Sequence, residues 1–206
     1  MTDRSEQNSF FAIVARMKYI DRWALMRNTH SENLSEHSLD TAIIAHALAV
    51  MRNKRFGGQV NPERAALLAV FHDVPEVMTG DMPTPVKYFS SAIRSAYAEV
   101  ETAAEQELLS LLPEDLREEY RPLITHEGED AELLRIVKCA DKLSALIKCM
   151  EEEKACNREF SAARTATEQA IREMGLPEGI AFLESFIPPF ALTLDEQKRF
   201  VPTDNG

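Results

Sequence analysis

Residues 69–85 read AVFHDVPEVMTGDMPTP, and the interpretation of the whole chain depends on them. The stretch begins as an apolar helical segment and then presents His72 and Asp73 side by side. Pro75 and Glu76 follow, and a segment rich in proline ends the stretch. A polar side chain in a protein core costs free energy unless it is hydrogen-bonded, paired or bound to a metal. The stretch therefore indicates a polar site built into a helical core.

Helical patterns continue on both sides of this stretch, without sustained strand-like alternation and without repeats. Residues 61–62, Asn-Pro, suit the first turn of the helix that carries His72. Ser35 is a plausible cap for the preceding helix, which we expect to end at the glycines 57–58. Further helices are predicted over residues 9–19, 90–112, 114–120, 130–150 (capped by Asp130), 157–174 and a short segment before Pro188.

Length and composition predict one all-α domain. The chain has 206 residues, of which 45% are hydrophobic and 28% charged, an ordinary balance for a globular protein. We expect the helical core to cover residues 9–196 and a polar tail to cover 197–206. A formal net charge of −11 argues against a nucleic-acid polymer as partner, because such binders neutralise phosphates with Lys and Arg. A small anionic substrate is still compatible, since a bound cation reverses the local field.

Targeting signals and cysteine usage predict a cytoplasmic protein. The N-terminal residues do not form a signal peptide, and the longest apolar run is about half of a membrane span. Cys139, Cys149 and Cys156 are odd in number and form no CxxC pair, so we expect reduced thiols.

Two further polar residues occupy helical positions that need a partner. Asp141 interrupts the apolar stripe of the helix predicted over 130–150, and His37 lies at the start of the second helix. In the helix predicted for the opening stretch, His72 and Glu76 are four residues apart and share one face. Two imidazoles and two carboxylates would form a mixed N/O site suited to Mn²⁺, Co²⁺, Fe²⁺, Ni²⁺ or Zn²⁺. The plainer alternatives are an accidental His-Asp pair and an Asp141 paired with a nearby lysine.

The remaining histidines are weaker candidates. His46 is nine residues after His37 and therefore faces away from the site, so we expect it to be packed. His30 and His126 lie in polar segments and are expected to be solvated.

The order His37, His72–Asp73 and Asp141 resembles the metal signature of HD-domain phosphohydrolases. The segments RWALMRN, SEHS, TGDMPTPVKYF and CADKL together resemble the bacterial HD-domain 5′-deoxynucleotidases of the YfbR type. The resemblance extends from about Phe10 to about Glu196. It implies a helical HD fold, a homodimer, and removal of phosphate from deoxyribonucleoside 5′-monophosphates.

The resemblance also implies roles for individual residues. One divalent cation, Co²⁺ or Mn²⁺ first, would be held by His37, His72, Asp73 and Asp141. Glu76 would transfer protons, and Arg22 would grip the phosphate with a planar fork that lysine lacks. The nucleoside would be bounded by the only tryptophan and by a proline-stiffened loop, whose residues are Trp23, Asp81, Met82, Pro83 and Thr84. His37, Asp73 and Asp141 would also contact the substrate.

Pro75 departs from the simple helical pattern. It removes the N–H that would bond the Phe71 carbonyl, so we expect a kink that changes the aim of Glu76.

Two other functions stay open at this point. One is hydrolysis of guanosine tetraphosphate, although Val77 stands where that pattern has a second acidic residue. The other is a non-catalytic HD module that senses a nucleotide, which the presence of Arg22 and Glu76 disfavours.

Overall fold

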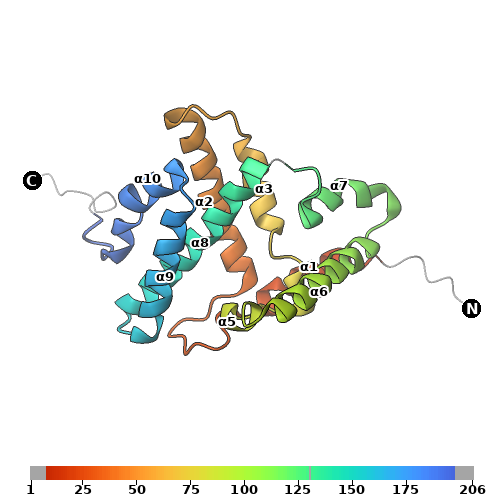
Figure 1. Cartoon of the computed structure of the whole chain (residues 1–206), viewed down its shortest axis with the longest axis horizontal. Coiled ribbons are helices and arrows are strands. Elements are labelled where there is room, and N and C mark those ends of the chain that lie inside the picture. The colour runs from red at the N-terminus through yellow and green to blue at the C-terminus, as the bar shows by residue number, and fades with distance from the viewer. Residues whose placement is uncertain (1–7, 130, 198–206) are drawn as a thin grey trace, which may run out of the picture.

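The computed structural model describes residues 8–129 and 131–197, and helix α3 (Pro62–Phe71) carries the beginning of the quoted stretch (Figure 1). As predicted, the Asn61 side chain accepts the N–H of Arg64, and Pro62 occupies the first turn. The helix ends at Phe71, whose carbonyl accepts the N–H of Val74 at 3.1 Å. Pro75 has no N–H to offer that carbonyl, so the expected kink becomes a complete break.

The chain continues from this break in turns, and helix α4 (Glu76–Thr79) follows. His72 and Glu76 therefore do not share one continuous helix, and that prediction is wrong. Gly80 ends α4 with a φ of +75°, a conformation that glycine adopts without strain.

Helix α2 (Leu34–Arg55) begins at Asn33 rather than at the predicted cap Ser35. The Asn33 side chain accepts the N–H groups of Ser35 and Glu36 at 3.0 and 3.1 Å, and the Glu36 carboxylate accepts the N–H of Asn33. This reciprocal capping box satisfies more free N–H groups than a lone serine would. Ser35 consequently lies inside the helix, and His37 falls in its first turns.

The other helices follow the predicted order with changes at their ends. The first is divided between α1 (Phe10–Val14) and a 3₁₀ turn (Ala15–Tyr19). Helix α7 is longer than expected, and a short α5 replaces part of the expected loop. The elements are α5 (Thr84–Lys87), α6 (Ser91–Ser110), α7 (Glu114–Thr125), α8 (Ala131–Lys154), a 3₁₀ turn (Arg158–Phe160), α9 (Ser161–Glu173), α10 (Pro177–Ser185) and a last 3₁₀ turn (Pro188–Ala191).

The all-α prediction is confirmed: within the described ranges the only β-type pairing is an isolated bridge between Asp21 and Asn33. The predicted cap Asp130 and the tail beyond Gln197 lie outside the described residues. None of the described helices is long and apolar enough to cross a membrane.

Two hydrophobic clusters hold the helices together. The larger one joins α2, α3, α8 and α10, and the smaller one joins α1, α6 and α7. Phe71 and Tyr120 pack against both clusters, with their ring centroids 5.8 Å apart. The end of α3 therefore lies where the two clusters meet, and His72 is the next residue.

Candidate active site

His72 is oriented by the break after α3. Its Nδ1 donates a hydrogen bond to the carbonyl of Ala69 at 2.7 Å, which fixes the proton on that nitrogen. The opposite nitrogen, Nε2, is buried and has no hydrogen-bond partner among the described residues, although Asp73 Oδ2 lies 3.2 Å away. Burial lowers the pKa of His72, but the charges of Asp73 and Asp141 raise it to about 9. The carboxylates therefore create a negative potential around Nε2, which attracts either a proton or a metal cation.

His37 comes from α2 and is completely buried. Its Nε2 faces Asp141 Oδ1 at 3.2 Å and Asp73 Oδ2 at 3.6 Å. Burial lowers the pKa of His37, but the contacts with Asp141 and Glu32 outweigh this effect and raise it. The imidazoles of His37, from α2, and of His72, which follows α3, therefore both face Asp73 and Asp141.

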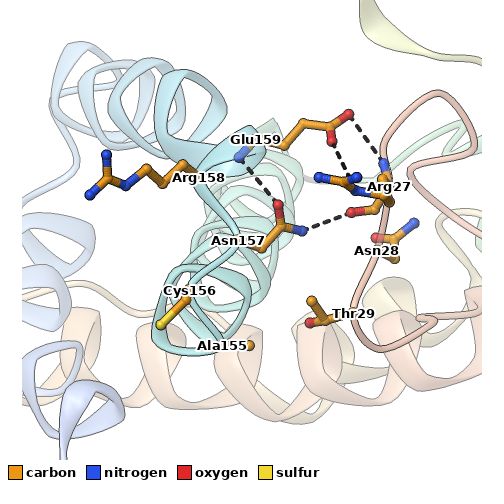
Figure 2. A pocket seen from close by; sticks show the side chains of 8 residues that line it. All are labelled: Arg27, Asn28, Thr29, Ala155, Cys156, Asn157, Arg158 and Glu159. Carbon is orange, nitrogen blue, oxygen red and sulfur yellow. Dashed lines mark hydrogen bonds and ion pairs between the residues drawn. The ribbon is translucent and has the colours of Figure 1, made fainter.

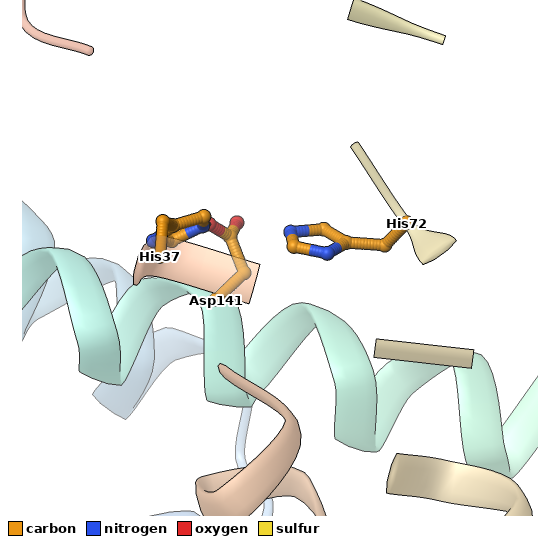
Figure 3. A group of neighbouring side chains, drawn as sticks. All are labelled: His37, His72 and Asp141. Atoms are coloured by element: carbon orange, nitrogen blue, oxygen red, sulfur yellow. The ribbon is translucent and has the colours of Figure 1, made fainter. Parts of the chain in front are cut away.

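Asp141 projects from α8 toward both rings, as Figure 3 shows. One ligand atom each from His37, His72 and Asp141 lies within 4.8 Å of the others. Burial raises the pKa of Asp141, but the two histidines and Arg22 hold it below its usual range. A half-buried carboxylate that stays ionised between two imidazoles gives, together with them, a suitable set of donors for a divalent cation.

Asp73, the fourth predicted ligand, lies beside this group. Its Oδ2 contacts the Nε2 atoms of His37 and His72 and also accepts a hydrogen bond from Arg22 Nη1 at 3.2 Å. The structure therefore brings Arg22 to the edge of the His37, His72 and Asp141 group through one carboxylate. Its guanidinium is the permanent cation of the site.

Trp23 has a strained backbone. Its φ is +59°, a value that costs a bulky residue about 1–3 kcal/mol. Three contacts compensate for this strain. The Trp23 N–H donates to Asp81 Oδ2 at 3.2 Å, the indole Nε1 donates to Glu32 Oε2 at 2.8 Å, and the ring packs against Phe160 with centroids 5.3 Å apart.

The predicted loop of Asp81, Met82, Pro83 and Thr84 is only partly as expected. Asp81 bonds to Trp23, and Asp81, Met82 and Pro83 are half-buried. The loop prediction is wrong at Thr84, because α5 begins there and the Thr84 carbonyl accepts the N–H of Tyr88. Pro85 fits in the first turn of a helix, where its missing N–H costs nothing. Thr84 is exposed.

Glu76 begins α4 and is largely buried, with Oε2 lacking a hydrogen-bond partner among the described residues. Burial and the nearby charges of Asp73 and Asp81 raise the pKa of Glu76 to about 8, although Arg22 and His72 oppose the shift. Glu76 therefore lies within the electrostatic reach of the site and carries a proton at neutral pH.

The remaining histidines only partly follow the predictions. His46 is exposed rather than packed, and His30 is exposed as expected. His126 is half-buried and adopts a left-handed conformation with φ of +60°, and its Nε2 is buried without a partner in the described part of the chain. It is therefore less solvated than expected.

Glu32 was not predicted as a site residue. Its side chain contacts Arg22, Trp23 and His37. The segment around it is polar, and no periodic pattern marks this one glutamate. Its position depends on the bridge between residues 21 and 33, which places Arg22 opposite Glu32 and becomes visible only in three dimensions.

A surface hollow of about 470 Å³ lies near the Trp23 segment rather than over the histidines. It is lined by residues 27–29 on one side and 155–159 on the other (Figure 2). Asn157 closes it by donating to the Arg27 carbonyl at 2.7 Å. The hollow contains none of the residues that surround His37.

Comparison with known proteins gives consistent matches over nearly the whole chain. Residues 9–190 match the family model described as 5′-deoxynucleotidase YfbR-like. A 5′-deoxynucleotidase of Vibrio cholerae is 51% identical over 191 residues, covering 93% of this chain and 98% of that protein. The 5′-deoxynucleotidase YfbR of Escherichia coli is 49% identical over 197 residues, covering 96% of this chain and 99% of that protein.

Solved structures show the same fold at lower identity. An HD-domain phosphohydrolase of Listeria innocua is similar with a TM-score of 0.79 and 23% identity, covering 92% of each chain. An HD phosphohydrolase of cyanophage S-2L, bound to dA and one catalytic Zn²⁺ ion, has a TM-score of 0.63 and 16% identity, covering 91% of this chain and 98% of that one.

Proposed function

The chain belongs to the 5′-deoxynucleotidase YfbR-like family and is a 5′-deoxynucleotidase, and from this premise we propose how its own residues perform the hydrolysis. The substrates are deoxyribonucleoside 5′-monophosphates. Family membership decides against the two alternatives raised by the sequence, a guanosine tetraphosphate hydrolase and a nucleotide-sensing module.

The group of His37, His72 and Asp141 fits a divalent cation. His72 keeps its proton on Nδ1 through Ala69, so the lone pair of Nε2 points into the group, where it has no hydrogen-bond partner among the described residues. We assign these three residues and Asp73 as the ligands. Mixed nitrogen and oxygen donors suit Co²⁺ and Mn²⁺, which are our first choices. When bound, such a cation acts as a Lewis acid on a phosphate oxygen and on water.

Arg22 is assigned to the phosphate. Its Nη1 lies 3.2 Å from Asp73 Oδ2, so its positive charge borders the group of His37, His72 and Asp141. A guanidinium can hold two phosphate oxygens at once and balance the charge that develops on them. The proposal rests mainly on one observation: the guanidinium of Arg22 lies beside the group of His37, His72 and Asp141.

Glu76 is assigned to proton transfer. Because burial and its acidic neighbours raise its pKa to about 8, it is protonated at neutral pH. A carboxylic acid in that state can deliver its proton to the departing 5′-oxygen, which otherwise leaves as a poor alkoxide leaving group. The attacking water releases one proton and Glu76 regains one, so the number of protons is conserved over the reaction.

Trp23, together with the segment of Asp81, Met82, Pro83 and Thr84, is assigned to the nucleoside. The backbone N–H of Trp23 donates a hydrogen bond to the Asp81 side chain. This bond links Trp23 to the Asp81 segment, and the two would form opposite walls of the nucleoside pocket. A pocket that offers no partner to a 2′-hydroxyl would disfavour ribonucleotides, because burying an unpaired hydroxyl costs about 1–3 kcal/mol.

A phosphate-release panel tests this function. Matched deoxyribo- and ribonucleoside 5′-monophosphates are compared with Co²⁺, with Mn²⁺ and after chelation. We expect release from the deoxy substrates, a clear preference over the ribo partners, and loss of activity on chelation. Equal rates for each pair, or full activity after chelation, would contradict the assignment.

The oligomeric state and location are also proposals. The family resemblance supports a cytoplasmic homodimer. Light scattering on the purified protein measures the oligomeric state. A mass of 23.2 kDa, that of a single chain, rather than twice that value would contradict the homodimer.

A further inference from the structure

Glu32 is a buried carboxylate for which the proposed mechanism has no role. Only 8% of the residue is exposed, and it lies immediately before α2 and its cap Asn33. Ionised carboxylates are rarely buried unless several groups compensate them. The partners of Glu32 are three residues of the proposed site.

Arg22 is the first partner. The Arg22 N–H donates to the Glu32 carbonyl at 2.9 Å, and its guanidinium Nε lies 3.5 Å from Glu32 Oε2. The other side of the guanidinium, Nη1, bonds to Asp73. Arg22 Nε is buried and makes no hydrogen bond within the described ranges, so Glu32 acts on this side of the guanidinium as a neighbouring negative charge, while Asp73 bonds the other side.

Trp23 is the second partner. Its indole N–H donates to Glu32 Oε2 at 2.8 Å, the shortest of the three contacts. This bond anchors the ring of a residue whose backbone is strained at φ of +59°. Without it, the strained segment would lose one of its three compensating contacts.

His37 is the third partner. Its Nδ1 lies 3.6 Å from Glu32 Oε1 and 3.2 Å from the Ser144 hydroxyl. Both groups can accept a hydrogen bond from the Nδ1–H, which leaves the lone pair of Nε2 directed toward Asp141. A carboxylate behind a metal-binding histidine orients the ring and makes it a stronger ligand.

We propose that Glu32 is a positioning residue that couples the three parts of the site, by orienting the phosphate-binding guanidinium, the nucleoside-binding indole and one metal-binding imidazole. Both carboxylate oxygens take part: Oε2 contacts Arg22 and Trp23, and Oε1 contacts His37. The inference rests on the proposed roles of these three residues. It implies that loss of one side chain weakens cation binding and nucleotide turnover together.

The test compares three variants. Glu32→Gln keeps the shape but removes the charge, and Glu32→Asp keeps the charge but withdraws the oxygens by one methylene. Thr29→Val is the matched control, because it removes one hydrogen bond from the same segment, to Glu152, without touching the three site residues. We expect its effect to be confined to the stability of the protein.

Two readouts are independent of turnover. Titration calorimetry gives the affinity for Mn²⁺ and Co²⁺, and the emission of Trp23, the only tryptophan, reports the surroundings of the indole. For Glu32→Gln we expect cation affinity and kcat/KM each to fall about 10–100-fold, the usual cost of losing a group behind a metal ligand. Glu32→Asp should lose as much and shift the Trp23 emission, because its carboxylate no longer reaches the indole. Thr29→Val should stay within about threefold of the wild type in both quantities, because the single hydrogen bond that it removes, to the Glu152 carboxylate, does not involve Arg22, Trp23 or His37.

Three results would overturn the inference. The first is a Glu32→Gln variant that keeps wild-type cation affinity and turnover. The second is a Glu32→Asp variant that restores both, which would mean that charge alone matters. The third is a Thr29→Val variant with equal losses, which would assign the effect to the stability of the segment. A wild-type protein that binds the cation but releases no phosphate would instead refute the proposed function. In that case the cation affinities of the Glu32 variants, measured by calorimetry, would still test whether Glu32 orients His37.

Discussion

At the scale of single residues, each carboxylate of the site has its own surroundings. Asp141 stays ionised between two imidazoles, whereas Glu76 is protonated because it is buried near other acids. Asp73 lies between the histidines and Arg22. This separation of pKa values is consistent with the proposed roles of one carboxylate as a metal ligand and of another as an acid.

Replacement of Asp141 by alanine should remove the cation and the activity together. The variant loses the only carboxylate of the His37, His72 and Asp141 group, and the two remaining imidazoles repel each other when protonated. Metal content, measured by mass spectrometry, should fall well below one equivalent. The exposed residue Glu184, changed to alanine, provides the control. A full equivalent of metal in the Asp141 variant would refute its role as a ligand.

Replacement of Glu76 by glutamine should slow kcat by about 10²–10⁴-fold, the usual worth of a positioned acid or base. In the wild type, kcat should also fall as the pH rises through about 8, because Glu76 then loses the proton that it donates. The glutamine variant should lack this alkaline limb. The measurement is a pH profile at saturating cation, and a ratio of wild-type to variant kcat below ten would exclude Glu76 from the chemistry.

Replacement of Trp23 by alanine should narrow the preference for deoxyribonucleotides. The indole is fixed by Glu32 and Phe160, so it can act as a rigid wall of the nucleoside pocket. The kcat/KM values for matched deoxyribo and ribo substrates give the preference. If the ratio of kcat/KM values for deoxyribo and ribo substrates is unchanged, the segment that begins at Asp81, and not Trp23, discriminates between the two sugars.

At the scale of elements, the segment that carries Arg22 is fastened to α8. Glu152 accepts the N–H groups of Thr29 and His30 and is paired with Lys148, which also donates to the His30 carbonyl. Lys148 and Glu152 are both buried. A buried pair of this kind costs little while it is intact but much when one partner is lost.

Replacement of Glu152 by glutamine should therefore destabilise the protein by about 3–5 kcal/mol, because Lys148 is left buried and unpaired. Burial raises the pKa of Glu152, but bonds from Lys148, Asn157 and Thr29 hold it below its usual range. The stability that it contributes is complete above the unfolded pKa of about 4.3 and is lost as the pH falls toward the lower native pKa. Melting temperatures between pH 3 and 7 check this expectation. The melting temperature of the variant should depend less on pH in the acid range, because the contribution of Glu152 is missing. Curves of the same shape for the variant and the wild type would contradict the assigned role of Glu152.

The elements also show what the sequence can and cannot predict. The starts of α3 and α6 were predicted because Asn61 and Ser90 cap them locally. The end of α3 was predicted only in part, because Pro75 indicated a kink, whereas the bond from the Val74 N–H to the Phe71 carbonyl at the break is not visible in the periodicity. His72 and Asp141 stand out in apolar helices, whereas Glu32 acquires its partners from an irregular segment. Sequence patterns predict positions along helices, and contacts between irregular segments follow only from the folded chain.

At the scale of the whole molecule, the site joins three parts of the fold. His37 comes from α2, His72 follows α3, and Asp141 belongs to α8, and these helices share the larger hydrophobic cluster. A cation bound by all three would hold these helices together. Binding to the native state alone raises the free energy of unfolding in proportion to the logarithm of the cation concentration.

Chelation should therefore lower the melting temperature, and Mn²⁺ or Co²⁺ should restore it. At a free cation concentration of 100 times the dissociation constant, the stabilisation is about 2.7 kcal/mol. Calorimetric melting of the wild type and of the Asp141→Ala variant makes the comparison. The variant should show little dependence on the cation, and an equal shift in both proteins would mean that the stabilising ion binds elsewhere.

The spacing of the ligands along the chain has a consequence for biosynthesis. His37 and Asp141 touch in the folded protein although 104 residues separate them. At translation rates of about 5–20 residues per second, the second of these residues emerges roughly 5–20 s after the first. A nascent chain that has released α2 and α3 therefore holds two histidines but not the carboxylate between them. A cation would therefore meet all three of the proposed ligands His37, His72 and Asp141 only once α8 has left the ribosome and docked.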